Sequence, residues 1–544
     1  MAGHSRFQDL ERRSIVSSFI FHFPTNDGSG EGSPRVALFK RSGEVNTYKH
    51  QIAPISGTIS RSDASPLSAA WRELSEETGL NERTLTFWRS GKLFSSVDES
   101  VKREWTIYPF AFLLKDSDTA IKIDWEHESW EWYDPSSVLK DKSFEEKGVP
   151  RLKESLRRVY LEGEVNPDAA QVFRNGLERL KNDHSSGSHE LAGIALGIFR
   201  DFVIAMKPSM PIDPESDASS RWWERISLAV WHIVKNGRES MGAATLNALL
   251  AILEEMDEVR KLDEPLDWKM ERFLTIIEHH IKGRNSRAGL VKEKFASYFR
   301  EQFLQGSGKG KRERFTILTL FASSTIRDSI VQAFASLDIG TLELRVLESR
   351  PLFEGVTFAS SVLENFRGAC EDTLEKRLHV QIYTDASVAI AADGVDVVLL
   401  GADRISRSKG VSNKAGSFPT VLSTKHITPS AKIVVLSELE KVNGENGIID
   451  DEKHEDNDPA ELLNSWRNDN VKGIKGIEEA FKIGENSSNA TVEVRNVYFE
   501  WIPLSLIDAF VSGEGVLNDN RIHEKANQQE ELASRYFDGI SIRY

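Results

Sequence analysis

Short runs of apolar residues, broken by polar turn segments, make up the first quarter of the chain. Runs of this length are typical of β-strands. The strands predicted between residues 14 and 135 are Ile15–Phe23, Val36–Phe39, Trp105–Leu114 and Trp130–Tyr133. One helix, predicted from Pro66 to Thr78, interrupts them. The pattern therefore predicts a sheet with a helix inserted between its strands.

The pattern changes twice along the rest of the chain. From residue 136 to 310 apolar positions recur at helical spacing almost throughout, most clearly in Ala192–Phe202, Trp222–Val234 and Ala243–Val259. From 311 to 437 strands alternate with helices, which predicts a parallel sheet with crossover helices. We therefore expect an α/β multidomain protein with domains at 12–145, 146–310 and 311–544.

The last hundred residues carry a different composition. Residues 440–492 are polar and acidic, which predicts a surface insertion in the third domain. We expect the last strand at Val494–Glu500, followed by a helix from Pro503 to Val511.

Composition and charge narrow the functional classes. The 544 residues include 69 Lys+Arg and 84 Asp+Glu, a formal net charge of −15. Such a chain is poorly suited to wrapping DNA or binding anionic lipid, so we expect neither a nucleic-acid nor a membrane partner. The single cysteine, Cys370, allows no internal disulfide. Without a visible signal or apolar span, the expected location is the cytoplasm.

The helix predicted at Pro66–Thr78 carries three carboxylates close together. Glu73, Glu76 and Glu77 fall within an arc of roughly 100° on a helix. Their mutual repulsion would fall if a divalent cation lay among them, because Mg²⁺ prefers oxygen ligands. Arg72 lies four residues before Glu76 and is placed to orient it, and Gly79 is placed to end the helix. A solvated acidic helix face is the alternative for these glutamates alone.

The wider segment resembles the Nudix box. Arg72-Glu73-Leu74-Ser75-Glu76-Glu77-Thr78-Gly79-Leu80 matches the second half of that pattern in full. The first half departs from it: the interval from Gly57 is one residue longer, and the first glutamate is missing or replaced by Asp63. Trp125-Glu126-His127 resembles a later strand of the same family.

That resemblance implies an α/β/α sandwich that hydrolyses a nucleoside diphosphate linked to another group. It implies Arg72, Glu73, Glu76, Glu77 and Glu126 as catalytic residues, with Glu126 or a box glutamate as general base. The metal ligands, for Mg²⁺ or Mn²⁺, would come from Gly57, Glu73, Glu76 and Glu77. A nucleotide or nucleotide sugar would be the substrate.

A second set of polar residues follows the strands predicted in the third domain. Asp385 and Asp403 each follow a strand, and Asn413 and Lys414 precede a glycine. Ligands bind at the carboxyl ends of parallel strands, and Arg350 is similarly placed. Acids, an amide and cations at one sheet edge suit a phosphorylated polyol. For Asp403 or Asn413 alone, capping of a turn or helix is the simpler explanation.

Together these segments resemble one superfamily over residues 165–540. It comprises the alpha, beta and delta subunits of eukaryotic initiation factor 2B, methylthioribose-1-phosphate isomerase and ribose-1,5-bisphosphate isomerase. Gly401-Ala402-Asp403-Arg404-Ile405 and Asn413-Lys414-Ala415-Gly416 carry the resemblance. It implies a helical subdomain, a Rossmann-like sheet domain and a homodimer formed through this half.

The isomerases of this superfamily use a cysteine and an aspartate as an acid/base pair. Asp403 matches the aspartate, but Phe321 or a neighbour stands where the cysteine is expected. Three hypotheses follow. The first is a Nudix hydrolase whose second half binds a sugar phosphate or nucleotide. The second is a non-catalytic regulatory or scaffold protein like initiation factor 2B. The third is a ribose-phosphate aldose–ketose isomerase.

Overall fold

The structure of this chain is a computed structural model. It describes residues 10–24, 32–184, 186–211, 213, 216–304, 312–321, 323–369, 376–445, 448–449, 455–483 and 492–540. Cys370 and parts of the predicted acidic insertion (446–447, 450–454 and 484–491) lie outside the described residues.

An eight-stranded sheet forms the N-terminal part. Its path is β3-β2-β1-β7-β5, with β4 paired to β1, β6 to β7 and β8 to β2. Strands β1 and β7 are parallel, with Glu11 opposite Arg103 and Phe21 opposite Leu113. The strands are β1 (Glu11–His22), β2 (Arg35–Arg41), β3 (Ile52–Ala53), β4 (Ile55–Thr58), β5 (Leu85–Ser90), β6 (Phe94–Asp98), β7 (Arg103–Leu114) and β8 (His127–Tyr133).

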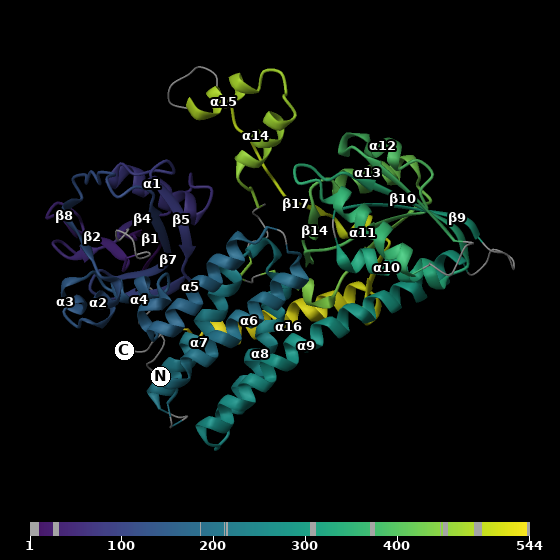
Figure 1. Cartoon of the computed structure of the whole chain (residues 1–544). Helices are drawn as coiled ribbons and strands as arrows, with labels where there is room; N and C mark the ends of the chain where they lie inside the picture. Colours follow the sequence, from purple (N-terminus) through teal and green to yellow (C-terminus); the bar gives the residue numbers. More distant parts are fainter. Residues whose placement is uncertain are drawn as a thin grey trace.

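Helices cover both faces of this sheet (Figure 1). Helix α1 (Pro66–Thr78) packs on one face through Ala69, Ala70 and Leu74. The other face is covered by α2 (Pro135–Lys140), α3 (Phe144–Lys147) and α4 (Leu152–Arg157). Because successive side chains of a strand point to opposite faces, one sheet contributes to two hydrophobic cores. The sandwich expected from the resemblance is therefore confirmed.

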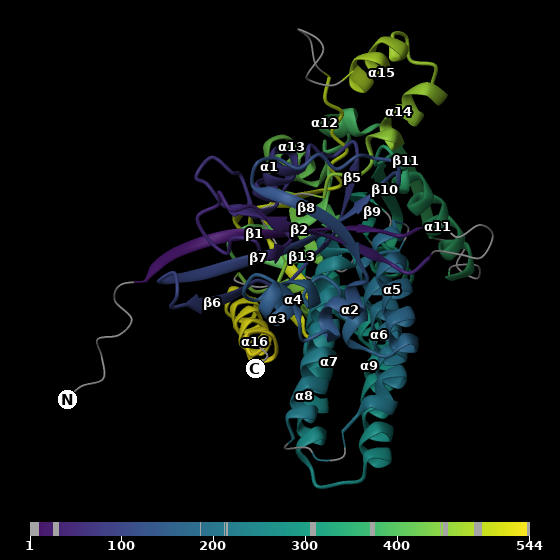
Figure 2. The ribbon, with the colours of Figure 1, turned by 90° about the vertical axis from the view of Figure 1, so that its left-hand side faces the viewer.

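A bundle of long helices links the two sheet domains (Figures 1 and 2). Its helices are α5 (Pro167–Asn182), α6 (Ser188–Met206), α7 (Asp217–Asn236), α8 (Ala243–Lys261) and α9 (Leu266–Phe299). The fully buried Trp222, Phe199 and Phe273 belong to its core. The C-terminal helix α16 (Asp519–Phe537) adds Tyr536 and Phe537 to the same core.

The third domain contains a seven-stranded sheet of order β11-β10-β9-β12-β15-β18-β19, parallel except for its last pair. Separate apolar clusters pack on its two faces. The strands are β9 (Arg312–Leu320), β10 (Ile339–Leu347), β11 (Arg377–Tyr383), β12 (Val397–Leu400), β15 (Lys432–Leu436), β18 (Ala509–Ser512) and β19 (Gly515–Leu517). Its longer helices are α10 (Ser324–Ser336), α11 (Glu354–Ala369) and α13 (Ser417–Ile427), and α12 (Val388–Ala391) is one turn. The predicted α/β multidomain class is confirmed.

A small second sheet, not expected from the sequence, carries part of the predicted ligand-binding set. Its order is β16-β13-β14-β17. The strands are β13 (Arg404–Ser406), β14 (Gly410–Lys414), β16 (Val442–Asn443) and β17 (Phe499–Ile502). Each of these strands is too short to give a clear alternation of apolar and polar residues in the sequence.

The helix predicted from Pro503 to Val511 is wrong. The segment forms one 3-10 turn at Leu504–Leu506 and then strand β18, which pairs in parallel with β15. Strand pairing buries Phe510 and Val511 in the sheet domain. Tertiary pairing has therefore overridden the local helix signal of a leading proline.

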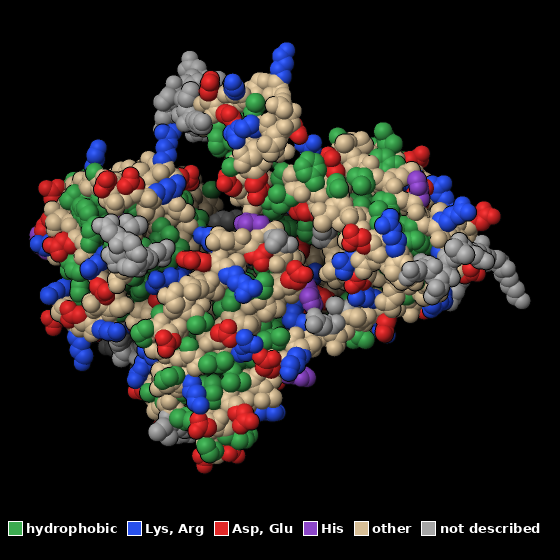
Figure 3. Space-filling view, in the orientation of Figure 1, with side chains coloured by type: hydrophobic (Ala, Val, Ile, Leu, Met, Phe, Trp, Pro, Cys, Tyr) green, Lys and Arg blue, Asp and Glu red, His purple; other side chains and the backbone are tan. Residues whose placement is uncertain are grey.

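A helical arm stands out from the third domain, at the top of Figures 1 and 3. It consists of α14 (Pro459–Asn468) and α15 (Ile474–Ile483), within the predicted insertion. Over the face shown in Figure 3, acidic and basic side chains are interspersed. None of the described helices is long and apolar enough to cross a membrane.

Buried polar contacts join the N-terminal sheet to the helical bundle. The main chain of Ser90 in β5 exchanges two hydrogen bonds with the Asn236 side chain of α7, at 2.8 and 2.9 Å. Arg89 forms an ion pair of 2.8 Å with Glu162, and each side chain is at most 2% exposed. A buried charge pair requires good geometry to offset its desolvation. The two parts therefore meet in a defined arrangement.

Candidate functional sites

Helix α1 presents the acidic residues of the first site. Its N-cap, Ser65, accepts a bond from the backbone N–H of Ser68, and Pro66 occupies the first turn. Gly79 ends the helix with a φ of 70°, a left-handed conformation that glycine adopts without strain. The local sequence signals at both ends agree with the observed helix.

Arg72 holds the loop and the helix together. Its guanidinium donates two bonds of 3.0 Å to Asp63, from Nε and Nη2. It also donates to Glu73 at 2.7 Å and Glu76 at 3.1 Å, and to the carbonyl of Thr58 at 3.1 Å. The Arg72 bonds, followed by the N–H of Ser60, lower the pKa of Asp63 well below its usual range. Asp63, whose role the sequence left open, thus anchors the lengthened loop.

Gly57 fits closely against Glu73. A Cβ atom at Gly57 would lie 1.9 Å from the Cδ atom of Glu73. Only a residue without a side chain lets the β4 backbone come this near to the carboxylate. Gly57, which the resemblance implies as a metal ligand, therefore also leaves free the space that the Glu73 carboxylate occupies.

Glu77 points inward and pairs with His127. Its Oε2 lies 2.6 Å from Nε2 of His127, and both side chains are at most 3% exposed. Burial, followed by the charges of Glu126 and Glu73, raises the pKa of Glu77. Burial lowers the pKa of His127. Glu77 Oε1 has no hydrogen-bond partner. Sequence reasoning did not assign His127 a role.

This carboxylate set fits a divalent cation. The unpartnered Glu77 oxygen and the repulsion among Glu73, Glu77 and Glu126 are the features that a cation would relieve. All four candidate ligands supply oxygen, which Mg²⁺ and Mn²⁺ prefer. Within the described ranges, no three acidic or histidine side chains are already drawn together around a metal position. In this arrangement the Arg72 guanidinium lies against two of the glutamates.

A cavity of about 810 Å³ opens beside the carboxylates. Gly57, Glu73 and Glu126 line it, whereas Glu76 and Glu77 do not. Burial, followed by the charge of Asp124, raises the pKa of Glu126. The cavity volume suits a nucleotide-sized ligand.

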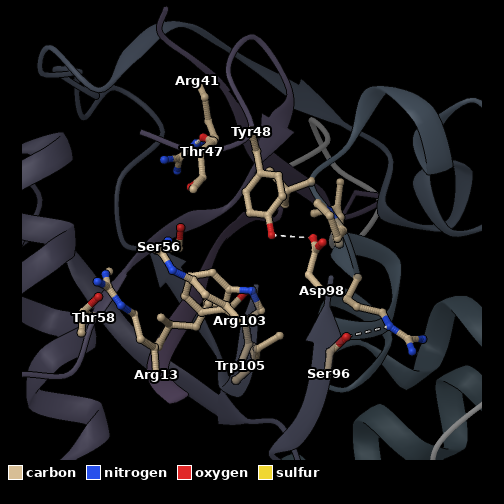
Figure 4. Close-up of a pocket in the computed structure, with 18 of the residues that line it drawn as sticks. Arg13, Arg41, Thr47, Tyr48, Ser56, Thr58, Ser96, Asp98, Arg103 and Trp105 are labelled. Atoms are coloured by element: carbon tan, nitrogen blue, oxygen red, sulfur yellow. Dashed lines mark hydrogen bonds between the residues drawn. The ribbon is translucent and has the colours of Figure 1, made fainter. Parts of the chain in front are cut away.

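The rest of this cavity combines cations with aromatic rings (Figure 4). Its further lining includes Arg13, Arg41, Tyr48, Arg103, Trp105, Trp125 and Arg151. The guanidinium of Arg103 lies 5.3 Å from the centre of the Trp105 ring, and the hydroxyl of Tyr48 donates to Asp98 at 2.8 Å. Thr58, next to Gly57, lies across the drawn cavity from Asp98.

Sequence reasoning missed these residues, although a signal was present. Arg13, Ile15 and Ser17 alternate along β1, and Arg103, Trp105 and Ile107 alternate along the parallel neighbour β7. Side chains two apart share a face of a strand. Once the pairing of β1 with β7 is known, the two series can be recognised as one surface that lines the cavity.

The second candidate site is a cavity of about 240 Å³ in the third domain. It contains Asp403 and Asn413 of the predicted set. The N-terminal ends of α6 and α10 both reach it, through Ser188 and Ser324. Hydroxyl groups and two basic side chains make up much of the remaining lining: Ser323, Thr325, Thr357, Ser361, Ser437, Arg327 and Lys441.

Asp403 is buried in this cavity with Oδ2 lacking a hydrogen-bond partner. Burial raises its pKa, against the opposing influence of Lys441 and other nearby cations. Burial of this kind disfavours the charged form of a carboxyl group relative to an exposed aspartate. Asn413 donates from Nδ2 to the hydroxyl of Ser417 at 2.9 Å.

Lys414 lies in an adjoining cavity of about 560 Å³. Its Nζ donates to Glu354 at 2.7 Å and lies 3.9 Å from the centre of the Tyr498 ring. Phe321, at the end of β9, lines both cavities and has a φ of 69°. The two neighbouring residues of the predicted motif thus face different spaces.

Arg350 and Asp385 line neither of these two cavities. Asp385 accepts the backbone N–H groups of Ser349 and Arg350, at 2.9 and 2.8 Å, and so holds their loop. The half-exposed Arg350 side chain contacts Glu348 at 3.0 Å and Asp469 at 3.5 Å. Their binding roles stay predictions. His189 and Glu438, which do line the smaller cavity, were missed by sequence reasoning.

Comparison with known families agrees with both resemblances. The sequence model of the Initiation factor 2 subunit family matches residues 240–519, and that of the NUDIX domain matches residues 21–157. Methylthioribose-1-phosphate isomerase of Pseudomonas fluorescens is 27% identical over 172 residues, which span 31% of this chain and 40% of that protein. The same enzyme of Bacillus pumilus is 22% identical over 54% of this chain and 77% of its own length.

Solved structures are similar at low identity. The translation initiation factor eIF-2B of Pyrococcus horikoshii OT3 is 15% identical, with a TM-score of 0.42, and covers 63% of this chain and 96% of its own. The 5-methylthioribose 1-phosphate isomerase from the same organism is 17% identical, with a TM-score of 0.42, and covers 66% and 88%.

Proposed function

Because this chain belongs to the initiation factor 2 subunit family and carries a NUDIX domain, we propose that it is a hydrolase fused to a ligand-binding domain. The N-terminal domain cleaves the diphosphate bond of a nucleoside diphosphate linked to another group. The observation that carries this proposal is that Glu73 of the box and Glu126 line a large cavity together with arginines and aromatic rings.

Each residue of the first site has a proposed task. Glu73, Glu76 and Glu77, with the main chain of Gly57, hold Mg²⁺ or Mn²⁺. Such an ion, when bound, neutralises phosphate charge and lowers the pKa of a bound water. Glu126 accepts a proton from the attacking water, and its raised pKa brings it closer to the range of an effective base.

The remaining groups position the substrate. Arg72 orients Glu73 and Glu76 through the bonds that it donates. Arg41 and Arg103 supply positive charge for the diphosphate, and the Trp105 ring offers a face on which a base can stack. The proposed substrates are nucleotide sugars and dinucleotides.

In the third domain we assign sugar-phosphate binding to the 240 Å³ cavity. Two helix N-termini, Lys441 and Arg327 favour an anion there, and the hydroxyl groups suit a polyol. The alternative, a scaffold or sensor like the initiation factor subunits, is supported by Phe321 at the end of β9, where no thiol is present. In that alternative, neither domain catalyses a reaction.

Hydrolysis by the purified full chain tests the first proposal. Incubation with nucleotide sugars, dinucleotides and dinucleoside polyphosphates in Mg²⁺ or Mn²⁺, followed by analysis of released phosphate species, should identify a substrate. Glu76→Gln should lower the rate by about 100-fold or more, because it removes a charged ligand. Glu82→Gln, an exposed glutamate just beyond the helix, is the control. Full activity in Glu76→Gln would contradict the assigned site.

A further inference from the structure

A third cavity, of about 910 Å³, lies where the N-terminal domain, the helical bundle and the third domain meet. Its lining includes Ser90 and Lys92 of the N-terminal domain, Lys235 of α7 and Asp538 at the end of α16. The contact between Lys92 and Asp538 is therefore part of its wall. We call it the junction cavity. The proposed function does not use it, and its volume suits a small organic ligand.

One wall of the junction cavity is an aromatic surface of the N-terminal sheet. Tyr108 and Phe110 of β7 line the cavity together with Phe87 of β5. Side chains two apart on a strand share a face, and this face is the one that packs on α1. Helix α1 begins at Pro66, which also lines the cavity, and the rings of Tyr108 and Phe87 are only partly buried. A planar ring system can stack on such a surface.

Each of the three parts that meet at the junction cavity contributes one lysine to its lining. Lys92 lies in the turn between β5 and β6, Lys235 on α7, and Lys409 in the turn between β13 and β14. The Lys92 side chain is 15% exposed, and burial lowers its pKa against the opposing charge of Asp538. A phosphate group would accept hydrogen bonds from such cations and offset the cost of burying them.

The four acidic side chains of the lining already have partners within the chain. Each is bonded to a cation or to a backbone N–H: Glu239 to Lys235, Asp538 to Lys92, Glu445 to Arg407, and Glu530 to the N–H of Glu445. These partners reduce the repulsion that the carboxylates exert on an anion. Their remaining lone pairs can accept hydrogen bonds from hydroxyl or amino groups of a ligand.

We propose that the junction cavity binds a nucleoside monophosphate. The base stacks on the rings of Tyr108 and Phe87, the phosphate accepts hydrogen bonds from the lysines, and the ribose hydroxyls donate to the carboxylates. A nucleoside monophosphate is the class of product that the proposed hydrolysis releases, so the identity of the ligand rests on that proposed function.

A ligand in the junction cavity contacts all three parts of the chain. Pro66 and Leu67 place the first turn of α1, the helix that carries the box glutamates, in its wall, and α7 and α16 contribute the opposing side chains. A ligand that binds only the native state stabilises it by mass action. Occupancy should therefore raise the Tm of the N-terminal domain and the bundle together, and slow hydrogen exchange in β5.

Calorimetric titration of the full chain with AMP as the probe, in the absence of divalent cations, tests this inference. We expect saturable binding, with the same affinity in Glu76→Gln, because Glu76 does not line the junction cavity. Adenosine, which lacks the phosphate, should bind about 10-fold more weakly, because it loses the charge-assisted hydrogen bonds.

Substitutions in two different domains locate the bound probe. Tyr108→Leu should weaken AMP binding by about 10-fold, because it removes a ring on which the base stacks, whereas Tyr108→Phe should bind like the wild type. Lys409→Ala should weaken AMP binding by about 10-fold and leave adenosine binding unchanged. The control is Lys261→Ala, which removes an exposed lysine paired with Asp257 at the end of α8. Circular dichroism should show that each variant is folded.

The outcomes separate this inference from the proposed hydrolysis. AMP binding that is weakened in both Tyr108→Leu and Lys409→Ala supports the junction cavity, even if no substrate is hydrolysed and the proposed hydrolysis fails. AMP binding that is unchanged in both folded variants but weakened in Trp105→Leu places the nucleotide beside the box carboxylates. That result overturns the inference and leaves the proposed hydrolysis standing. Absence of AMP binding also overturns the inference.

Discussion

At the scale of single residues, Gly57 shows how a missing side chain can set a site. Its backbone approaches Glu73 so closely that any Cβ atom would occupy the place of the carboxylate. We predict that Gly57→Ala lowers hydrolysis by about 10–100-fold, because displacement of a catalytic group by about 1 Å has costs of this size. Steady-state rates on the identified substrate measure this.

The control for this substitution is Gly193→Ala on α6, where a new Cβ atom would meet nothing within 4 Å. Its hydrolysis should equal that of the wild type. If Gly57→Ala also retained full activity, Glu73 would not need its observed position.

Helical spacing predicted that three carboxylates of α1 lie close together, and their roles at a metal site stay predictions. Glu73, Glu76 and Glu77 are grouped by helical spacing, and spacing requires no knowledge of the rest of the fold. Spacing did not reveal that Glu77 turns inward to His127, because that contact joins α1 to β8.

At the scale of elements, the Arg89–Glu162 pair joins β5 to the segment before α5. We predict that Glu162→Ala lowers the free energy of unfolding by about 3–5 kcal/mol, because it leaves a buried guanidinium without its partner. Urea unfolding followed by circular dichroism measures the change.

The matched control is an exposed pair of the same kind. Arg12 is 85% exposed and lies 2.8 Å from Glu104. Glu104→Ala should cost less than about 1 kcal/mol, since solvent screens this pair. If the two substitutions lowered the free energy of unfolding equally, Arg89 would have to be paired with another group or hydrated in Glu162→Ala.

Long elements were predicted better than short ones. Helix α1 begins and ends at the predicted residues, because its cap, proline and terminal glycine act locally. The helix expected from Pro503 is instead a turn and a strand, because β15 provides an edge to which β18 pairs. Of the four-stranded sheet that carries Asn413, only β17 was anticipated, because the strand expected at Val494–Glu500 overlaps it.

At the scale of the whole molecule, the N-terminal sheet and the end of helix α4 are bonded to two distant segments. Ser90 meets Asn236 of α7, and Arg158 donates to the carbonyl of Ile540 beyond α16. Lys92 also contacts Asp538 at 3.3 Å. The N-terminal domain is thus held by both the bundle and the C-terminal helix.

We predict from these contacts that the N-terminal domain and the helical bundle unfold together. Scanning calorimetry should show one transition for both, and hydrogen exchange should report equal global stability for β5 and α7. Asn236→Ala, which removes the bonds to Ser90, should lower the Tm of both. Two separate transitions in the wild-type chain would show that the junction is too weak to couple them.

The sequence by itself determined the features that depend on neighbours along the chain: the carboxylate set of α1, the caps of that helix, and the alternation of strands and helices. The tertiary structure decided which residues share a cavity. It separated Lys414 from Asn413, its neighbour in the chain, and joined His189 to Glu438, 249 positions away. The physical reason is that side-chain direction alternates along a strand, whereas contact between remote segments depends on how whole elements pack.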